Sequence, residues 1–232
     1  SNDVYSLLLG AIENNLLNIT KSYSLFVNGG YVVSPNIIKK VVSDSGQLIA
    51  NQEYYECKFC EFNKDNRSYR KPIIKPNNLN SITPQTSFQI LNILRGAVER
   101  GTGKSLNEID YPIAGKTGTT NDSKDLWFFG LTPKFVVGVY VGYDKPKKIG
   151  YKETGSSVAL PIFKSFMKEY LLSNNDIDND DFFIPKNLIL KKIDIDTGLF
   201  SDKDKSIFEF FTKDQLETIN NLNKVDNIGG IN

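Results

Sequence analysis

Residues 110–130 read DYPIAGKTGTTNDSKDLWFFG, and this stretch suggests two different structures that bind anionic groups. Gly115, Lys116 and Thr117 match the end of a phosphate-binding loop, whose full pattern is G-x-x-x-x-G-K-[ST]. Lys116, Thr117 and Gly118 also form a Lys-Thr-Gly sequence, which suits a strand that binds an extended substrate. The two interpretations require different neighbours, so the flanking residues decide between them.

The phosphate-loop interpretation fails at its first position. Its leading glycine should stand at position 110, but the sequence has Asp110, whose carboxylate would repel the phosphates that backbone amides should hold. A helix should also begin after Thr117, so that its N-terminus faces the anion. The sequence continues instead as Gly-Thr-Thr-Asn-Asp, which predicts an extended segment followed by a turn. We therefore expect no nucleotide-binding loop.

The other interpretation puts the Lys-Thr-Gly segment on an exposed edge strand, to which a peptide pairs as an added strand. Gly118 lacks a side chain and so lets the ligand backbone approach closely. Thr117 and Thr119 offer hydroxyls to a terminal carboxylate, and the Thr119 amide is a candidate donor to an oxyanion. Lys116 adds a cation and a proton-transfer group, which makes it the candidate catalytic residue. Three letters alone are equally compatible with a turn that contains an incidental lysine.

The composition restricts the chemistry further. The chain has 232 residues, 40% of them hydrophobic, which is enough to bury a sizeable core. Its 28 basic and 27 acidic residues leave a net charge of +1, so nothing indicates a nucleic-acid partner or an anionic membrane. There is no histidine, which excludes Ser-His-Asp and Cys-His catalysis and any zinc site that needs imidazole. A general base must come from Lys, Asp, Glu, Tyr or Cys.

Cys57 and Cys60 stand close together in the segment YYECKFCEFN. They supply half of the ligands of a structural zinc site, and no second cysteine pair completes it. The βαβ pattern that usually frames a redox Cys-x-x-Cys motif is not evident around them. We interpret them as a local disulfide or a free thiol pair in a surface insertion, and we predict no metal and no cofactor.

No segment of the sequence is predicted to anchor or target the chain. The longest apolar run, residues 135–143, is far shorter than the roughly 18 residues that cross a bilayer. Residues 1–15 have neither the basic start nor the cleavage site of a signal peptide. We therefore expect a soluble chain with no membrane span.

The hydrophobic periodicity predicts three helices. Their expected ranges are residues 20–29, with Thr20 as N-cap, 83–101, with Thr83 as N-cap, and 156–172. The apolar face of the second helix is expected to contain Ile90, Leu91, Leu94, Ala97 and Val98.

Strands are expected on both sides of the turn SDSG at residues 43–46. Three strand-like runs lie within residues 110–143, and their short connections predict an antiparallel meander. Residues 50–80 lose periodicity and are interpreted as a loop insertion. Residues 173–232 are interpreted as a loosely structured C-terminal extension with a short strand near LILKKIDIDTG, residues 188–198.

Residues 95–144, RGAVERGTGKSLNEIDYPIAGKTGTTNDSKDLWFFGLTPKFVVGVYVGYD, resemble the transpeptidase domain of the class A (bifunctional) penicillin-binding proteins along their whole length. In that family an R-G-T-G segment ends the helix before an AGKTGTT strand, and D-x-W-F-x-G-x-T-P forms the next strand. Residues 7–35 are similar to the family's stretch between its second and third motifs, and residues 156–171 to its closing helix. The resemblance covers most of residues 6–200 and is weakest in the insertion.

This resemblance implies an α+β fold in which residues 1–172 form the C-terminal portion of a transpeptidase domain. Three of the family's five antiparallel strands would be present, flanked by helices. The implied reaction is D,D-transpeptidation of peptidoglycan stem peptides through a serine acyl-enzyme, with β-lactams as mimics of the substrate. The resemblance further implies that Lys116 is the catalytic lysine and that the substrate-binding residues are Thr117, Gly118 and Thr119. The implied location is the periplasm or the inner membrane.

The family uses three motifs in chain order, S-x-x-K, S-x-N and K-T-G, and only the third is clear here. Four segments match the first two by letter but stand at the wrong places: SYRK (68–71), SFMK (165–168), SPN (34–36) and SNN (173–175). We therefore expect no nucleophile in this chain and no activity of the chain alone. The same absence disfavours a D,D-carboxypeptidase or a β-lactamase.

Two alternatives stay open at this point. The chain is one half of a split enzyme that works with an upstream-encoded fragment, or it is a non-catalytic module that binds peptidoglycan peptides or another partner. The strand at residues 134–143 would then present an apolar edge without its N-terminal neighbour, so the isolated chain is expected to be marginally stable or oligomeric.

Overall fold

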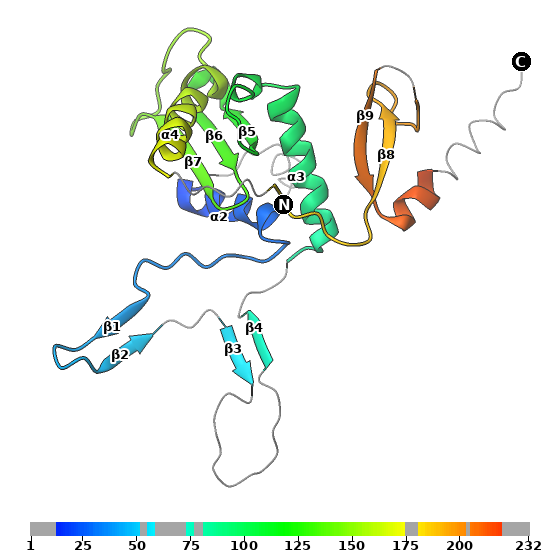
Figure 1. The fold of residues 1–232 in the computed structure, drawn as a ribbon. Helices are drawn as coiled ribbons and strands as arrows, with labels where there is room; N and C mark the ends of the chain where they lie inside the picture. The colour runs from blue at the N-terminus through cyan, green and yellow to red at the C-terminus, as the bar shows by residue number, and fades with distance from the viewer. Residues whose placement is uncertain are drawn as a thin grey trace, which may run out of the picture.

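The computed structural model describes residues 13–51, 55–58, 73–76, 81–174, 181–202 and 205–219, and Figure 1 shows its ribbon. The helices are α2 (Leu16–Val27), α3 (Pro84–Glu99) and α4 (Leu160–Ser173), and a further helix begins at residue 213. The strands are β1 (Lys40–Val42), β2 (Leu48–Asn51), β3 (Tyr55–Lys58), β4 (Ile73–Pro76), β5 (Ala114–Thr119), β6 (Asp125–Leu131), β7 (Val136–Gly142), β8 (Ile189–Asp194) and β9 (Ser206–Phe211). The mixture of helices with antiparallel sheets confirms the predicted α+β class.

The main sheet has three strands in the order β5-β6-β7, and both pairings are antiparallel. This arrangement confirms the meander that the short connections predict. The middle strand, β6, is almost entirely buried, and its side chains alternate between the two faces of the sheet. Helix α4 covers one face, and helices α2 and α3 cover the other.

The face under α4 is held by close contact between β6 and that helix. The rings of Phe128 and Phe163 have centroids 5.0 Å apart, and both side chains are fully buried. Gly130, two residues along β6, lies directly under Phe163, and a Cβ there would approach the ring atoms to less than 3.0 Å. A glycine at this position therefore lets the helix lie against the strand.

The opposite face carries the other set of β6 side chains. Phe129 stacks on Tyr23 of α2 with ring centroids 4.6 Å apart, and Trp127 stacks on Phe129 at 5.9 Å. Gly138 of β7 has no side chain where α2 passes, and a Cβ there would collide with Thr20. Beside α2, helix α3 packs on β5 through a second buried cluster, made of Phe88, Leu91, Leu94, Ala114, Leu131 and Phe182.

Of the two predicted N-terminal caps, one is confirmed and the other is wrong. Thr83 caps α3 as predicted, since its hydroxyl accepts a hydrogen bond from the Thr86 amide at 3.2 Å. The prediction of Thr20 as the cap of α2 is wrong, because the helix begins at Leu16 and its N-cap is Asn15, five residues earlier. Asn15 accepts from the Asn18 amide at 2.8 Å, whereas Thr20 donates to the Leu16 carbonyl within the helix.

The region after residue 180 contains more packed structure than the sequence indicates. Strand β8 confirms the predicted short strand, and it pairs with β9, which the sequence does not predict. The hairpin packs on α3, where Gln89 donates to the Phe210 carbonyl at 2.7 Å and the Phe88 and Phe210 rings lie 5.0 Å apart. Phe182, only 7% exposed, joins the cluster under α3. The division of the chain at residue 172 stays a prediction.

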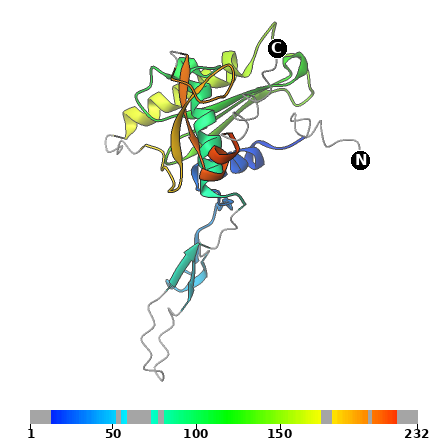
Figure 2. The ribbon, with the colours of Figure 1, turned by 90° about the vertical axis from the view of Figure 1, so that its right-hand side faces the viewer.

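The strands β1 to β4, which lie between α2 and α3 in the chain, extend away from the main body (Figures 1 and 2). Strands β1 and β2 pair around Gly46, whose φ of +81° is a conformation that glycine adopts readily, and this confirms the predicted SDSG turn. Within the predicted insertion, the described backbone comprises the end of β2 and the hairpin of β3 and β4. Cys57 lies on β3, but its side chain, Cys60 and Ser68 are outside the described residues. The interpretation of the cysteines therefore stays a prediction.

Of the helices that the structure describes, none is both long and apolar enough to cross a membrane.

The contact between Gly130 and Phe163 predicts a stability effect. We expect Gly130→Ala to destabilise the chain by roughly 1–3 kcal/mol, because the new methyl group must displace a fully buried ring. The measurement is the free energy of unfolding from urea titration followed by circular dichroism.

Gly96→Ala is the matched control for this experiment. The methyl group there would meet the guanidinium end of the Arg100 side chain, which is flexible and can move away at little cost. Equal unfolding free energies for the two variants would contradict the proposed close packing of α4 on β6.

Candidate functional site

The Lys-Thr-Gly residues lie on β5, which is an edge strand of the main sheet among the strands described. In the pairing with β6, Lys116 lies opposite Phe129, Thr117 opposite Phe128, and Gly118 opposite Trp127. The other edge of β5 carries no described strand. This edge has the form that an added peptide strand requires.

The hydrogen-bond pattern shows which amides face the open edge. The Thr120 amide donates to the Asp125 carbonyl at 3.0 Å, so this residue pair is directly hydrogen-bonded. Such pairs alternate along an antiparallel ladder, and the amides of Gly118 and Lys116 therefore point toward β6. It follows that the amides of Thr117 and Thr119 point toward the open edge. The Thr119 amide, the candidate oxyanion donor, thus faces the side where a ligand would pair.

The ammonium group of Lys116 lies at the same edge. Its side chain is exposed, and Nζ donates a hydrogen bond to the Thr117 carbonyl at 2.8 Å. That carbonyl points outward together with the Thr117 amide, so the cation lies close to the path of an added strand. The arrangement combines a positive charge with outward-pointing amides, which suits an anionic peptide ligand.

Thr117 is tied to the loop that follows α3. Its hydroxyl lies 3.0 Å from the hydroxyl of Thr102, and either oxygen can be the donor. Gly103, the next residue of that loop, packs against Val98 so closely that a Cβ would lie 3.0 Å from the Val98 Cα. The segment Arg-Gly-Thr-Gly thus brings a threonine to the candidate site. The sequence contains the Arg-Gly-Thr-Gly motif, but its residue chemistry did not predict a role for Thr102 at the site.

Thr119 is tied to another segment, the turn that precedes α4. The Gly155 amide donates to the Thr119 hydroxyl oxygen at 3.0 Å. Thr154 caps this turn by accepting a hydrogen bond from the Ser157 amide at 3.2 Å. The sequence analysis placed the closing helix correctly but did not predict its contact with β5.

The turn after β5 is held by a short chain of hydrogen bonds. The Asp125 carboxylate accepts from the Thr120 hydroxyl at 3.0 Å and from the Tyr140 phenol at 2.9 Å. The Tyr140 ring also packs on Trp127, with centroids 4.3 Å apart. The hydrogen bond to Asp125 is the main reason that the pKa of Tyr140 is raised above its ordinary value of 10.0. These contacts fix the end of β5 next to Thr119.

The segment SFMK at residues 165–168 lies on α4, where Ser165 is exposed. Lys168 pairs with Glu108, which Lys164 also contacts at 2.9 Å. Hydrogen bonds from these two ammonium groups lower the pKa of Glu108. Lys168 thus takes part in a surface ion-pair cluster.

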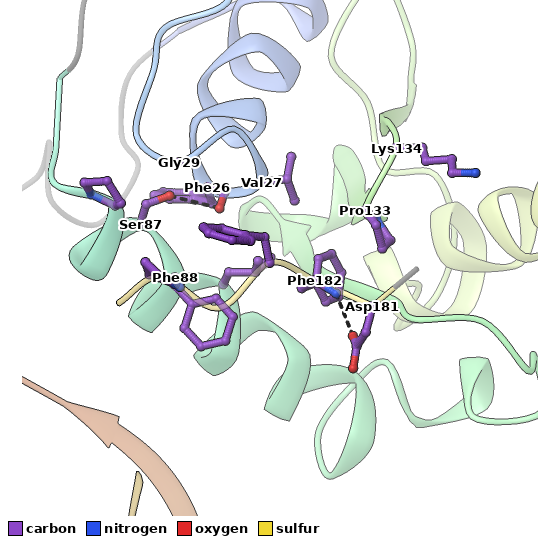
Figure 3. Close-up of a pocket in the computed structure, with 13 residues that line it drawn as sticks. Phe26, Val27, Gly29, Ser87, Phe88, Pro133, Lys134, Asp181 and Phe182 are labelled. Atoms are coloured by element: carbon purple, nitrogen blue, oxygen red, sulfur yellow. Dashed lines mark hydrogen bonds between the residues drawn. The ribbon is translucent and has the colours of Figure 1, made fainter. Parts of the chain in front are cut away.

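A cavity of about 310 Å³ lies away from β5, between the end of α2, the start of α3 and residues 181–185 (Figure 3). Its wall includes Phe26, Phe88 and Phe182. The hydroxyl of Ser87 donates to the carbonyls of Leu25 and Phe26, at 3.0 and 2.9 Å, and so ties α3 to α2. None of the residues that line the cavity belongs to β5. The described residues contain no group of three or more side chains suited to hold a metal ion.

Comparison with known proteins agrees with the geometry of β5 and its neighbours. The family model "Penicillin binding protein transpeptidase domain" matches residues 4–168. Penicillin-binding protein 1A of Rickettsia felis is 36% identical over 225 residues, which cover 97% of this chain and 28% of that protein. Penicillin-binding protein 1A of Aquifex aeolicus is 34% identical over 190 residues, which cover 82% of this chain and 23% of that protein. The chain thus spans about a quarter of the length of these relatives.

Among solved structures, the crystal structure of penicillin-binding protein 1A from Haemophilus influenzae has the same fold over most of the chain. The TM-score is 0.68 at 24% sequence identity, and the match covers 86% of this chain and 32% of that one.

The hydrogen bond between Tyr140 and Asp125 predicts a pH effect. We expect Asp125→Asn to lower the pKa of Tyr140 toward its ordinary value, since the carboxylate that stabilises the protonated phenol is gone. A folded-state pKa above the unfolded value stabilises the fold below about pH 10, and this contribution is lost as the pH rises further. The measurement is NMR titration of tyrosine labelled with ¹³C at the ζ carbon.

Asp144→Asn is the control, because Asp144 acts on Tyr140 only through a minor charge interaction. If the two variants shift the Tyr140 pKa equally, the hydrogen bond to Asp125 is not its main cause.

Proposed function

The chain belongs to the family of penicillin-binding protein transpeptidase domains, and on this basis we propose that it supplies the substrate strand of a D,D-transpeptidase. The enzyme would cross-link peptidoglycan stem peptides, and β-lactams would bind at the same strand. The observation that carries this proposal is the open edge of β5, with the amides of Thr117 and Thr119 and the ammonium of Lys116 directed toward it.

The proposed binding mode follows from this edge. A stem peptide would pair with β5 as an added strand, and its terminal carboxylate would accept hydrogen bonds from the threonine hydroxyls. The scissile carbonyl oxygen would lie near the Thr119 amide, which would stabilise the negative charge that develops there. Gly118 has no side chain and would therefore leave room for the peptide backbone.

The proposed reaction needs a serine nucleophile in addition. The serine oxygen bonds to the carbonyl carbon, the peptide bond to the terminal residue breaks, and the serine proton goes to the departing amine. An amine of a second stem peptide then attacks the ester carbonyl, a new peptide bond forms as the ester bond breaks, and the proton of the amine returns to the serine oxygen. Lys116 would take part in these proton transfers.

We propose that the serine is not one of the residues printed here, and that this chain is not acylated by itself. The pairing of Lys168 with Glu108 supports this view of the SFMK segment. A segment that carries the S-x-x-K and S-x-N motifs, on the same or on another polypeptide, would then complete the site. The periplasm or the outer face of the inner membrane, where the substrate is found, is the proposed location.

Labelling with a fluorescent penicillin tests the proposal. We expect no covalent label on the purified chain alone. We expect labelling when the segment of the Rickettsia felis relative that precedes the matched region is added. In that mixture, Lys116→Ala should slow labelling about 10²–10⁴-fold, as expected for a lost proton-transfer group.

Lys104→Ala is the matched control, because it removes an equal charge from an exposed lysine outside β5. Labelling of the chain alone would contradict the proposed need for a partner, and Ser165→Ala would then show whether α4 carries the nucleophile. Reversible peptide binding without labelling in either mixture would favour the non-catalytic binding module.

A further inference from the structure

The turn that leads into α4 touches the back of the candidate substrate strand. We propose that Gly155, in this turn, is a positioning residue that prepares the Thr119 hydroxyl to recognise a free carboxylate on the ligand. The proposal rests on the proposed function and adds a determinant of specificity to it. Gly155 itself makes no contact with the ligand in this scheme and acts through Thr119.

The contact between the two segments is unusually close. Gly155 is buried, and its amide donates to the Thr119 hydroxyl oxygen at 3.0 Å. A Cβ on Gly155 would lie 2.6 Å from the Gly118 carbonyl oxygen and 3.1 Å from the Gly118 nitrogen, and it would also collide with the Trp127 carbonyl oxygen. These are backbone atoms of the paired strands β5 and β6, which cannot move aside as a side chain can. Only a glycine therefore fits at this point.

The direction of the Gly155 amide is fixed by the turn itself. Ser157 and Thr154 form a reciprocal cap, in which the Thr154 amide donates to the Ser157 hydroxyl at 2.9 Å. The Ser157 hydroxyl in turn donates to the Glu153 carboxylate. The Gly155 carbonyl accepts from the Leu160 amide and closes the π-helical turn Gly155–Ala159. The amide that meets Thr119 is thus held by the start of a packed helix.

This contact changes what the Thr119 hydroxyl can do. A hydroxyl has one proton to donate and two lone pairs that accept. The Gly155 amide occupies one lone pair, and among the described residues the Thr119 proton has no acceptor in the hydrogen bonds found. The side chain is exposed, so the proton is available to a ligand. A hydroxyl held in this way favours an acceptor that carries negative charge, such as a carboxylate, over an amide group.

The test compares two N-acetylated peptides that end in two D-alanines, one with a free carboxylate and one with a C-terminal amide. Dissociation constants are measured by NMR titration of this chain. We expect it to bind the free acid roughly ten- to a hundredfold more tightly than the amide, the ratio typical of one hydrogen bond to a charged group. Gly155→Ala should bring the two dissociation constants close together, and Thr119→Val should do the same.

A double variant separates positioning from general damage to the fold. If Gly155 acts through Thr119, adding Gly155→Ala to Thr119→Val should not reduce the remaining preference any further. The ratio of the two dissociation constants in the double variant should be no smaller than in Thr119→Val alone. Gly96→Ala on α3, where the new methyl group meets only the end of the Arg100 side chain, is the matched glycine control and should keep the wild-type ratio. Thr119→Ser should keep it as well. If Gly155→Ala does not fold, exchange of the Gly155 amide with deuterium in Thr119→Val gives a second measurement. Faster exchange than in the wild type supports the contact, and unchanged exchange overturns it.

The outcomes distinguish this inference from the proposed function. A wild-type ratio in Gly155→Ala, or an equal loss of affinity for both peptides, overturns the positioning role and leaves the function intact. Equal binding of the acid and the amide by the wild type would also overturn the positioning role and leave the function intact. If the wild type binds neither peptide, the proposed function fails, and the role of Gly155 in recognition fails with it.

Discussion

The structure depends on the burial of β6 on both faces. A strand whose residues alternate between two apolar layers needs a helix above and below it, and it also needs a strand on each side for its backbone polar groups. Phe128 meets α4, while Phe129 meets α2. With β6 in the centre of the described sheet, β5 and β7 become its edges. The position of the Lys-Thr-Gly segment at an edge is therefore a consequence of the packing of its neighbour.

The position of β5 is set by more than its pairing with β6. The loop after α3 reaches Thr117 through Thr102, and the turn before α4 reaches Thr119 through Gly155. Asp125 holds the turn that follows the strand. Each of these contacts comes from an element that is itself anchored in one of the two buried clusters. The strand is thus held from behind and at its end, while the amides of its outer edge stay available.

Local sequence signals predicted much of this fold, because they act over short distances. Thr83 followed by Pro84 marked the start of α3, and the short turns among residues 110–143 indicated an antiparallel meander. The start of α2 was missed because Asn15 and Thr20 are both good caps, and tertiary packing on Gly138 selects between them. Contacts such as that between Gly155 and Thr119 join residues far apart in the chain. No local pattern contains them, so they could be found only in three dimensions.

The same contacts bear on how the candidate site can discriminate among ligands. Discrimination among ligands requires donors held in place before the ligand arrives, so that little free energy is spent on ordering them. The described contacts that hold Thr117 and Thr119 come from Thr102 and Gly155, and neither contact involves a nucleophile. In the proposed function, binding of a peptide to β5 and attack on its carbonyl are therefore physically separable tasks.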